Sequence, residues 1–77
     1  MYQEFKLDSG KTLVVTVKED GDCVTLSQQF SIDGKLATKT CTVTCHSTGK
    51  SYSWTCSDSQ NCFGDCSDPN NPKGKCT

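Results

Sequence analysis

The chain has 77 residues and a formal net charge of −1, from eight lysines and no arginine against nine acidic residues. A chain of this length forms one domain with a small core. Because arginine supplies bidentate contacts to phosphate and guanine, its absence argues against nucleic-acid recognition. No apolar run approaches the ~20 residues of a membrane-spanning helix, so no transmembrane segment is predicted.

Short runs of alternating apolar and polar residues, separated by turn residues, predict an antiparallel β-sheet. The expected strands are Tyr2–Leu7, Thr12–Lys18, Cys23–Ile32, Leu36–His46 and Ser51–Cys56. The connections contain Asp8-Ser9-Gly10, Asp20-Gly21, Asp33-Gly34 and Thr48-Gly49. Asp-Gly is a strong signal for a two-residue hairpin loop, and the first connection suits a three-residue loop ending in glycine.

These loops fix an expected register for the sheet. The predicted cross-strand pairs are Phe5–Leu13, Val17–Val24, Val15–Leu26, Val24–Val43, Leu26–Cys41, Phe30–Ala37, Val43–Trp54, Cys41–Cys56 and Cys45–Tyr52. In this register nearly every large apolar side chain lies on one face, with Gln28 as the polar exception, and hydroxyl-bearing residues lie on the other. A slip of one residue would scatter the apolar set over both faces.

The segment 57–77 is rich in Ser, Asp, Asn, Gly and Pro, and it carries Cys62, Cys66 and Cys76. This composition predicts a tail without regular structure. We therefore expect one all-β domain over residues 1–77. It consists of a small five-stranded antiparallel meander over 1–56, as a strongly twisted sheet or a partly closed barrel. An irregular Cys-rich C-terminal tail over 57–77 packs on its apolar face.

Seven cysteines make up a share of the chain that is typical of disulfide scaffolds in short exported proteins. Three of them, Cys41, Cys45 and Cys56, are predicted on the apolar face, and three lie in the tail. The six predicted disulfide cysteines are Cys41, Cys45, Cys56, Cys62, Cys66 and Cys76, with Cys23 as the candidate free thiol. Six cysteines allow 15 connectivities. Bridges between sheet and tail are favoured, and Cys41–Cys56 stays open as an alternative.

Metal binding is the main alternative reading of the cysteines. Cys41 and Cys45 would lie about 13 Å apart along a strand and could not share one ion. The thiolates of Cys56, Cys62, Cys66 and Cys76 could form a zinc site, although no C-x2-C pair is present. A calcium loop is disfavoured because Asp58, Asp65 and Asp68 with the neighbouring asparagines do not follow the EF-hand spacing. No metal or cofactor is therefore predicted.

A thiol active site is the weaker alternative. Cys23 is predicted on the hydroxyl-rich face, opposite Thr44 and diagonal to His46, and a histidine can activate a thiolate. No orienting acid accompanies this pair. The sequence contains no Gly-rich phosphate loop and no Ser-His-Asp arrangement, so no catalytic residue is assigned and a non-enzymatic protein is expected.

The aromatic and threonine residues allow further binding hypotheses. Tyr52 and Trp54 could stack on sugar rings, but their register favours packing in the core. The threonine rows could bind a carbohydrate, although they also suit a solvated strand surface. A protein or carbohydrate ligand is compatible with the sequence, as is a homodimer formed through a sheet edge or the apolar face.

The cysteines favour a small exported, disulfide-stabilised binding or structural module, located outside the cell or in the periplasm. The N-terminus has no apolar segment typical of a signal peptide, so an exported chain would be the mature form. If Met1 is native, a cytoplasmic zinc protein becomes the better expectation.

Overall fold

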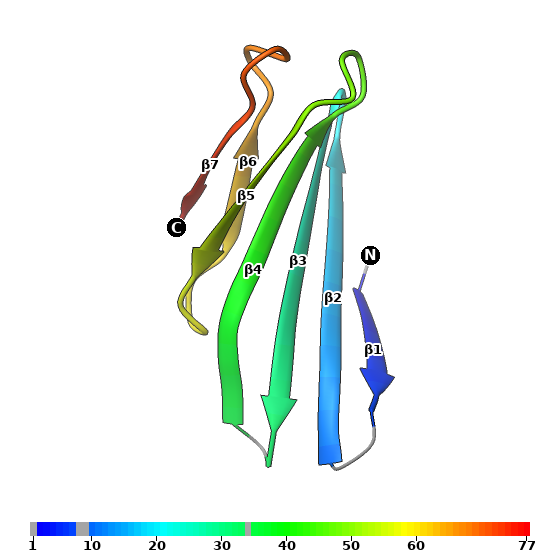
Figure 1. The fold of residues 1–77 in the computed structure, drawn as a ribbon, viewed down its shortest axis with the longest axis vertical. Coiled ribbons are helices and arrows are strands. Elements are labelled where there is room, and N and C mark those ends of the chain that lie inside the picture. The colour runs from blue at the N-terminus through cyan, green and yellow to red at the C-terminus, as the bar shows by residue number, and fades with distance from the viewer. Residues whose placement is uncertain (1, 8–9, 34) are drawn as a thin grey trace.

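The computed structural model describes residues 2–7, 10–33 and 35–77. The strands are β1 (Tyr2–Lys6), β2 (Lys11–Asp20), β3 (Cys23–Ile32), β4 (Lys35–Cys45), β5 (Ser51–Cys56), β6 (Cys62–Asp65) and β7 (Lys73–Cys76). The first five form one antiparallel sheet in chain order, and β6 and β7 form a second, two-stranded sheet (Figure 1). The predicted all-β fold is confirmed. Within the described ranges, no helix is long and apolar enough to cross a membrane.

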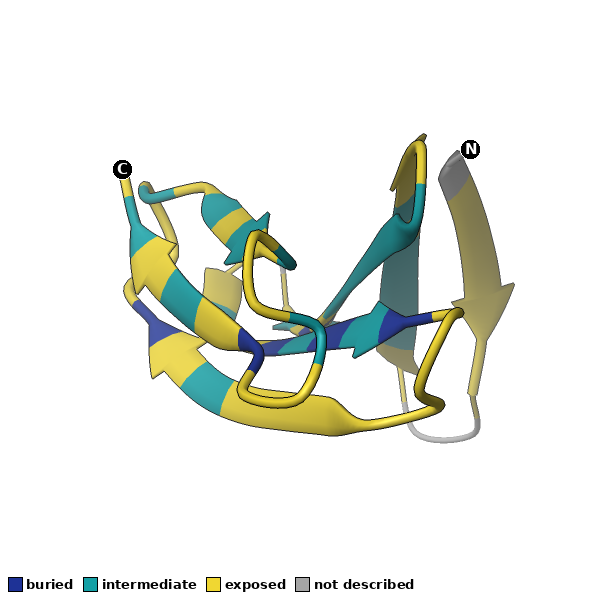
Figure 2. Ribbon diagram, turned by 90° about the horizontal axis from the view of Figure 1, so that it is seen from above, coloured by how far each residue is buried: buried dark blue, intermediate teal, exposed yellow. Residues whose placement is uncertain are grey.

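The Cys-rich tail lies on one face of the large sheet, as β6 over β3 and β4, and β7 over β4 and β5. Seen along the long axis, the sheet curves and the tail occupies part of its concave side (Figure 2). The prediction that this tail is irregular is wrong, because it forms a hairpin. Asp68 accepts hydrogen bonds from the backbone N–H groups of Asn70 and Asn71, at 3.2 Å to its carboxylate and 2.9 Å to its carbonyl. The Asp, Pro and Asn residues thus make the turn of the hairpin.

The register between β1 and β2 is as predicted, with Phe5 opposite Leu13. The Asp8-Ser9-Gly10 loop that was expected to set this register lies partly outside the described residues. Between β2 and β3 the predicted register is wrong by two residues, because Val17 faces Leu26 instead of Val24. The loop residues are Gly21 and Asp22, with φ of 62° at Gly21, so the strands extend further than expected.

A β-bulge divides the β3–β4 pairing into two parts. Next to the turn, Ile32 faces Lys35, which agrees with a two-residue Asp33-Gly34 loop, although Gly34 is outside the described residues. The register then shifts by one residue between Gln29 and Ser31. Beyond the bulge Val43 faces Thr25, so the predicted partners of β4 on β3 are wrong. The pairs corrected here are Val24–Val43, Leu26–Cys41 and Phe30–Ala37.

The β4–β5 connection is a four-residue loop, 46–49, and not the predicted two-residue loop. Cys45 N–H donates to the Lys50 carbonyl at 3.0 Å, and Gly49 N–H donates to the Cys45 carbonyl at 2.8 Å. The register is therefore displaced by two residues but each side chain keeps its face. Val43 faces Tyr52 and Cys41 faces Trp54, which corrects the predicted pairs Val43–Trp54, Cys41–Cys56 and Cys45–Tyr52.

The bulge places the apolar residues of the sheet on both faces, so the prediction of a single apolar face is wrong. We call the side under the tail the covered face and the other side the open face. The covered face carries Cys23, Thr25, Ser27, Gln29, Cys41, Val43, Cys45, Trp54 and Cys56. The open face carries Phe5, Leu13, Val15, Val17, Val24, Leu26, Phe30 and Ile32. Only the first group contributes to the buried core, which consists of Cys41, Val43, Cys45 and Cys56.

Two glycines let the tail approach the covered face closely. A Cβ atom at Gly64 would lie 2.5 Å from Thr25 Oγ1 and 2.6 Å from Val43 Cγ2. A Cβ atom at Gly74 would lie 2.2 Å from the Trp54 ring. All three distances are far inside van der Waals contact, so the backbone of the tail itself packs on the side chains of the sheet.

Replacing Gly64 with alanine should therefore lower the free energy of unfolding by about 1–3 kcal/mol through overpacking. Urea unfolding, followed by tryptophan fluorescence, measures the change. Val43→Ala should remove part of the steric conflict, so the double variant should lose less than the two single variants combined. Strict additivity would show that Gly64 does not pack on Val43.

Candidate functional site

Three disulfides join the sheet to the tail. They link Cys41 to Cys62, Cys45 to Cys66 and Cys56 to Cys76, with Cα–Cα distances of 5.7, 5.8 and 5.6 Å. Cys23 is a half-buried free thiol. The chain is thus disulfide-rich, and each bridge crosses from the covered face of the sheet to the tail hairpin, at β6, directly after β6 or at β7.

Two of the bridges follow a repeated spacing in the sequence. Cys41 and Cys45 are four residues apart on β4, and Cys62 and Cys66 are four residues apart at β6, with 21 residues separating the members of each bridge. Alternate residues of a strand share a face, so both cysteines of each pair point toward the other strand. Between the bridges, Val43 packs under Gly64. The matched C-x3-C pairs were the sequence signal for this pairing.

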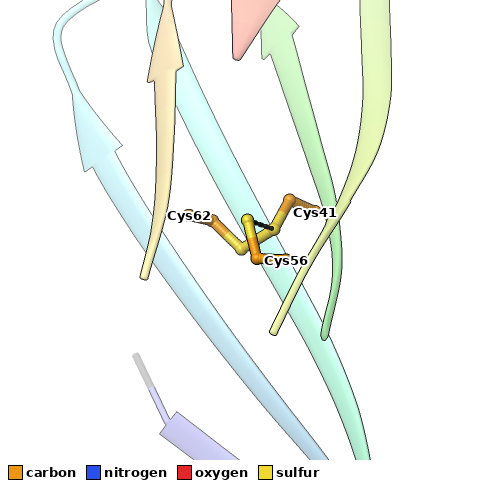
Figure 3. Close-up of side chains that lie close together, drawn as sticks. All are labelled: Cys41, Cys56 and Cys62. Atoms are coloured by element: carbon orange, nitrogen blue, oxygen red, sulfur yellow. Dashed lines mark hydrogen bonds between the residues drawn. A yellow bond between two sulfur atoms is a disulfide. The ribbon is translucent and has the colours of Figure 1, made fainter. Parts of the chain in front are cut away.

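The Cys41–Cys62 and Cys56–Cys76 bridges are in contact. The sulfur atoms of Cys41 and Cys56 lie 3.4 Å apart, and those of Cys41, Cys56 and Cys62 all lie within 4.8 Å of one another (Figure 3). This trio differs from the four-thiolate set considered from sequence, because Cys66 is bonded to Cys45. Three sulfurs at this spacing could ligate a zinc ion only if the bridges were reduced.

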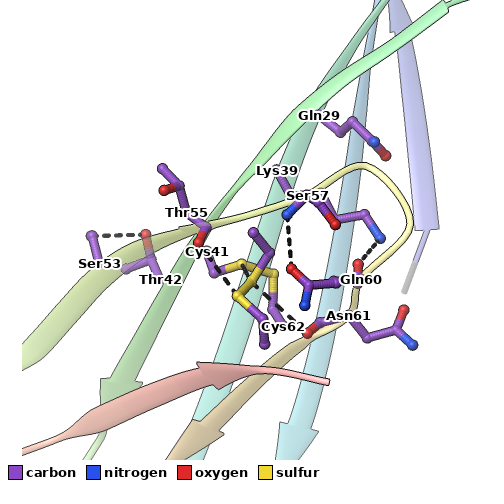
Figure 4. The surroundings of a disulfide bond; sticks show 12 residues. Gln29, Lys39, Cys41, Thr42, Ser53, Thr55, Ser57, Gln60, Asn61 and Cys62 are labelled. Atoms are coloured by element: carbon purple, nitrogen blue, oxygen red, sulfur yellow. Dashed lines mark hydrogen bonds between the residues drawn. A yellow bond between two sulfur atoms is a disulfide. The ribbon is translucent and has the colours of Figure 1, made fainter.

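Polar contacts close the connection between β5 and β6 beside this cluster (Figure 4). Ser57 N–H donates to the Gln60 side-chain oxygen at 3.1 Å, and the Lys39 ammonium donates to the Gln60 carbonyl. The buried Gln29 amide donates to the carbonyls of Ala37 at 2.9 Å and Asp58 at 3.4 Å. These bonds attach the start of the tail to β3 and β4 without using the disulfides.

Cys23 and His46 do not form the predicted thiol–imidazole pair. Cys23 faces Cys45 directly across the β3–β4 ladder, and it therefore lies on the covered face. His46 N–H donates to the Asp22 carbonyl at 2.9 Å, which places His46 opposite Asp22. Cys23 is thus paired with a cysteine of β4, while His46 belongs to the loop that follows this strand, so the placement of Cys23 opposite Thr44 and diagonal to His46 is wrong. The shift at the bulge is the reason for this error.

The acidic residues of the tail serve its turns. Asp65 accepts a hydrogen bond from Ser67 N–H at 2.9 Å. This backbone hydrogen bond, with a second contribution from the Ser67 hydroxyl, lowers the pKa of the Asp65 carboxyl below its ordinary value. Asp68 makes the equivalent contact with Asn70. These contacts are those of Asx turns.

A hollow lined by both polar and apolar side chains lies on the covered face beside the tail. Its volume is about 490 Å³, and its lining residues are Val14, Thr16, Lys18, Thr25, Ser27, Gln29, Lys39, Asn61, Cys62, Phe63 and Thr77. The hydroxyl groups come from β2 and β3, and β6 forms the opposite wall. Phe63 is 47% exposed, and the Lys75 ammonium lies 5.1 Å from the centre of its ring.

A second exposed aromatic residue on the covered face, Tyr52, lies on β5. Its ring is stacked on Trp54, with centroids 5.7 Å apart and an interplanar angle of 16°. Trp54 packs under Gly74, while Tyr52 remains 46% exposed. This pair supports β7 and is not among the residues that line the hollow.

Comparison with known proteins yields no relative for this chain: no protein-family model, curated protein or solved structure matches it. A function for this chain is therefore inferred from its own geometry, above all that of the hollow and of the sulfur cluster.

The stability of the covered face should depend on the bridges. Replacing both Cys56 and Cys76 with alanine should lower the free energy of unfolding by about 2–4 kcal/mol, because the loop of about 20 residues is then unconstrained in the unfolded chain. Urea unfolding measures the loss. Cys23→Ala, which breaks no bridge, is the matched control and should cost less than about 1 kcal/mol. Equal losses in both variants would contradict the assignment.

Proposed function

We propose that the protein is a small exported, disulfide-stabilised module that acts by binding a hydrophilic ligand in the hollow beside the tail. The observation that carries this proposal is the hollow itself, which is walled on one side by the sheet and on the other by β6. The disulfides of β6 fix that wall against β4. A wall held in this way is preorganised, which reduces the entropy lost on binding.

The lining of the hollow indicates the class of ligand. Its volume of about 490 Å³ lies within the usual range for small-molecule sites. Hydroxyl groups of Thr16, Thr25 and Ser27, together with the Lys18 ammonium, favour a ligand with many hydroxyl or acidic groups. Phe63 at the rim offers an aromatic face for a sugar ring. We therefore propose a saccharide as ligand, and an acidic saccharide in preference to a neutral one.

Export is supported by the three disulfides, which are compatible with an oxidising, extracellular environment. In the cytosol the same cysteines would be kept reduced by the thiol pool. The bridges and the binding hollow thus depend on the same compartment, since the covalent attachment of β6 to β4 exists only in the oxidised chain.

Binding can be tested by saturation-transfer NMR with a panel of neutral and acidic oligosaccharides. An acidic saccharide should give transfer, and Phe63→Ala should weaken its binding about threefold to tenfold through the loss of ring contact. Tyr52→Ala is the matched control, because that ring has nearly the same exposure but lies outside the hollow. Absence of binding across the panel, or equal loss in both variants, would contradict the proposal.

A second candidate function is a structural zinc site. It is favoured by the close spacing of the Cys41, Cys56 and Cys62 sulfurs. In a reducing compartment these thiolates would lie together, with Cys76 near enough to Cys56 in the fold to serve as the fourth ligand. Four thiolates would give zinc a closed tetrahedral site.

Counting free thiols separates the two candidates. Protein purified from an oxidising compartment without reductant should be alkylated once by iodoacetamide, at Cys23. Its intact mass should lack two hydrogen atoms for every bridge. Alkylation at all seven cysteines after metal removal, together with a native mass higher by one zinc ion, would replace the exported module with the zinc protein.

A further inference from the structure

The open face of β1, β2 and β3 is an apolar surface that the tail does not cover. Its eight apolar residues are Phe5, Leu13, Val15, Val17, Val24, Leu26, Phe30 and Ile32. Three of them are strongly exposed, with Phe5 at 47%, Phe30 at 45% and Ile32 at 40%. The tail is held by its bridges on the opposite face, so it cannot be the segment that covers this surface.

The total surface of the molecule is larger than its mass requires. The accessible area is 5105 Å², whereas a folded monomer of 8.4 kDa typically exposes about 4,600 Å². The surplus of about 500 Å² per molecule would become about 1,000 Å² in a pair, which is the lower limit of a specific interface. A second copy is therefore sufficient to remove the surplus.

Charged residues flank the open face in a self-complementary arrangement. Lys11 and Lys35 lie at one end, on either side of Ile32 in the ladder. Glu19 lies at the other end, where it faces Val24. Along β2, Lys11 and Glu19 are separated by roughly 27 Å of strand backbone, with Val15 midway between them.

We propose that this open face binds a second copy of the chain. The twofold axis lies in the plane of the interface, runs perpendicular to the strands and passes near Val15. Rotation about this axis brings the two apolar faces together. Lys11 of each copy then meets Glu19 of the other, as an isologous interface requires. A twofold axis parallel to the strands would instead oppose like charges. An anionic membrane is less well matched, because the acidic Glu19 occupies one end of the face.

This dimer does not depend on the saccharide proposal. The hollow lies on the covered face of each copy, so both hollows stay accessible on the outside of the pair. A chain that fails to bind saccharide can still form the dimer, and a monomeric chain can still bind saccharide.

Sedimentation equilibrium of the oxidised protein, from about 1 to about 500 µM, should show a reversible monomer–dimer equilibrium with Kd in the micromolar range. Glu19→Lys should weaken it about tenfold, because two attractive contacts per dimer become repulsive. The reciprocal double variant, Lys11→Glu with Glu19→Lys, should restore the affinity. Lys18→Glu, which alters the neighbouring residue on the covered face, is the matched control and should have little effect.

A protein that stays monomeric throughout this range would overturn the dimer. A dimer that is equally sensitive to Lys18→Glu and Glu19→Lys, or one that the double variant does not restore, would place the interface elsewhere. Cosedimentation with phosphatidylserine vesicles, without dimerisation in solution, would identify a lipid surface as the occupant and would likewise overturn the proposal.

A second inference comes from a different observation, the placement of Cys23. Cys23 faces Cys45 directly across the ladder, and Cys45 is already bonded to Cys66. The neighbouring Asp22 carbonyl accepts from His46 N–H, while Cys45 N–H is directed to Lys50 on the other side. Cys23 and Cys45 are therefore a non-hydrogen-bonded pair, for which the Cα atoms lie about 4.5 Å apart. This separation falls within the range that a disulfide spans.

The geometry points to an internal thiol–disulfide exchange. The Cys23 thiolate attacks Cys45 Sγ, a Cys23–Cys45 bond forms and the Cys45–Cys66 bond breaks. The bonding electron pair leaves with Cys66 Sγ, which takes up the proton that Cys23 lost. The number of disulfides is unchanged, so no oxidant is needed. The other two bridges still hold the tail, and only the hairpin loop between β6 and β7 is released.

Non-reduced peptide mapping tests this exchange. The protein is incubated at mildly alkaline pH, where thiolates attack faster, then quenched with acid and labelled with N-ethylmaleimide. Label should appear at Cys66 as well as Cys23, together with a Cys23–Cys45 linked peptide, while Cys23→Ser should abolish both signals. His46→Ala is the control and should change neither. Label confined to Cys23 after prolonged incubation would overturn the inference.

Discussion

The β-bulge between Gln29 and Ser31 determines how the rest of the molecule is arranged. It shifts β4 by one residue against β3, which moves every β4 side chain beyond that point to the other face. Cys41 and Val43 of β4 consequently lie opposite Ser27 and Thr25 of β3 instead of opposite Leu26 and Val24. The tail, which is bonded to the cysteines of β4, lies on the same face of the sheet. One extra residue thus separates a surface that is covered by disulfide-bonded strands from an apolar surface that remains open.

The two halves of the sheet are stabilised in different ways. The half formed by β4, β5 and the tail has a small core in which cysteine is the main residue, since Cys41, Cys45 and Cys56 are buried with Val43. Its stability comes largely from cross-links that restrict the unfolded chain. The half formed by β1, β2 and β3 has hydrogen-bonded ladders and a half-buried apolar face. Burial of that face adds hydrophobic stabilisation only when something covers it.

The five strands of the large sheet, their order and their antiparallel pairing followed from the sequence, because alternation and turn residues are local signals, whereas the two strands of the tail were not predicted. Two strands, Cys23–Ile32 and Ser51–Cys56, have the predicted bounds. The assignment of residues to the two faces of the sheet could not be predicted, because a bulge depends on packing between strands and leaves no local signal in the sequence around Phe30. The β4–β5 loop was misassigned for a related reason, since Thr48-Gly49 also suits the end of a four-residue turn.

The candidate site could likewise be predicted from the sequence only in part. The link between sheet and tail could be anticipated from composition, and the matching C-x3-C spacings contained the pairing of two bridges. The hollow could not be anticipated, because it exists only where β6 lies beside the part of the sheet that the tail leaves uncovered. The sequence predicts Cys23 near His46 only because the expected register does not include the bulge. In the structure its partner across the ladder is a cysteine.

The distribution of the bridges also sets how the molecule responds to mechanical force. All three cross-links lie between Cys41 and Cys76, so no disulfide limits the extension of the chain before Cys41. A pull on the two ends would peel β1, β2 and β3 apart through their full contour length. The chain from Cys41 onward could extend only by the length of its shortest covalent path, which runs through the Cys56–Cys76 bridge. The protein is thus an extensible N-terminal ribbon joined to a nearly inextensible C-terminal end.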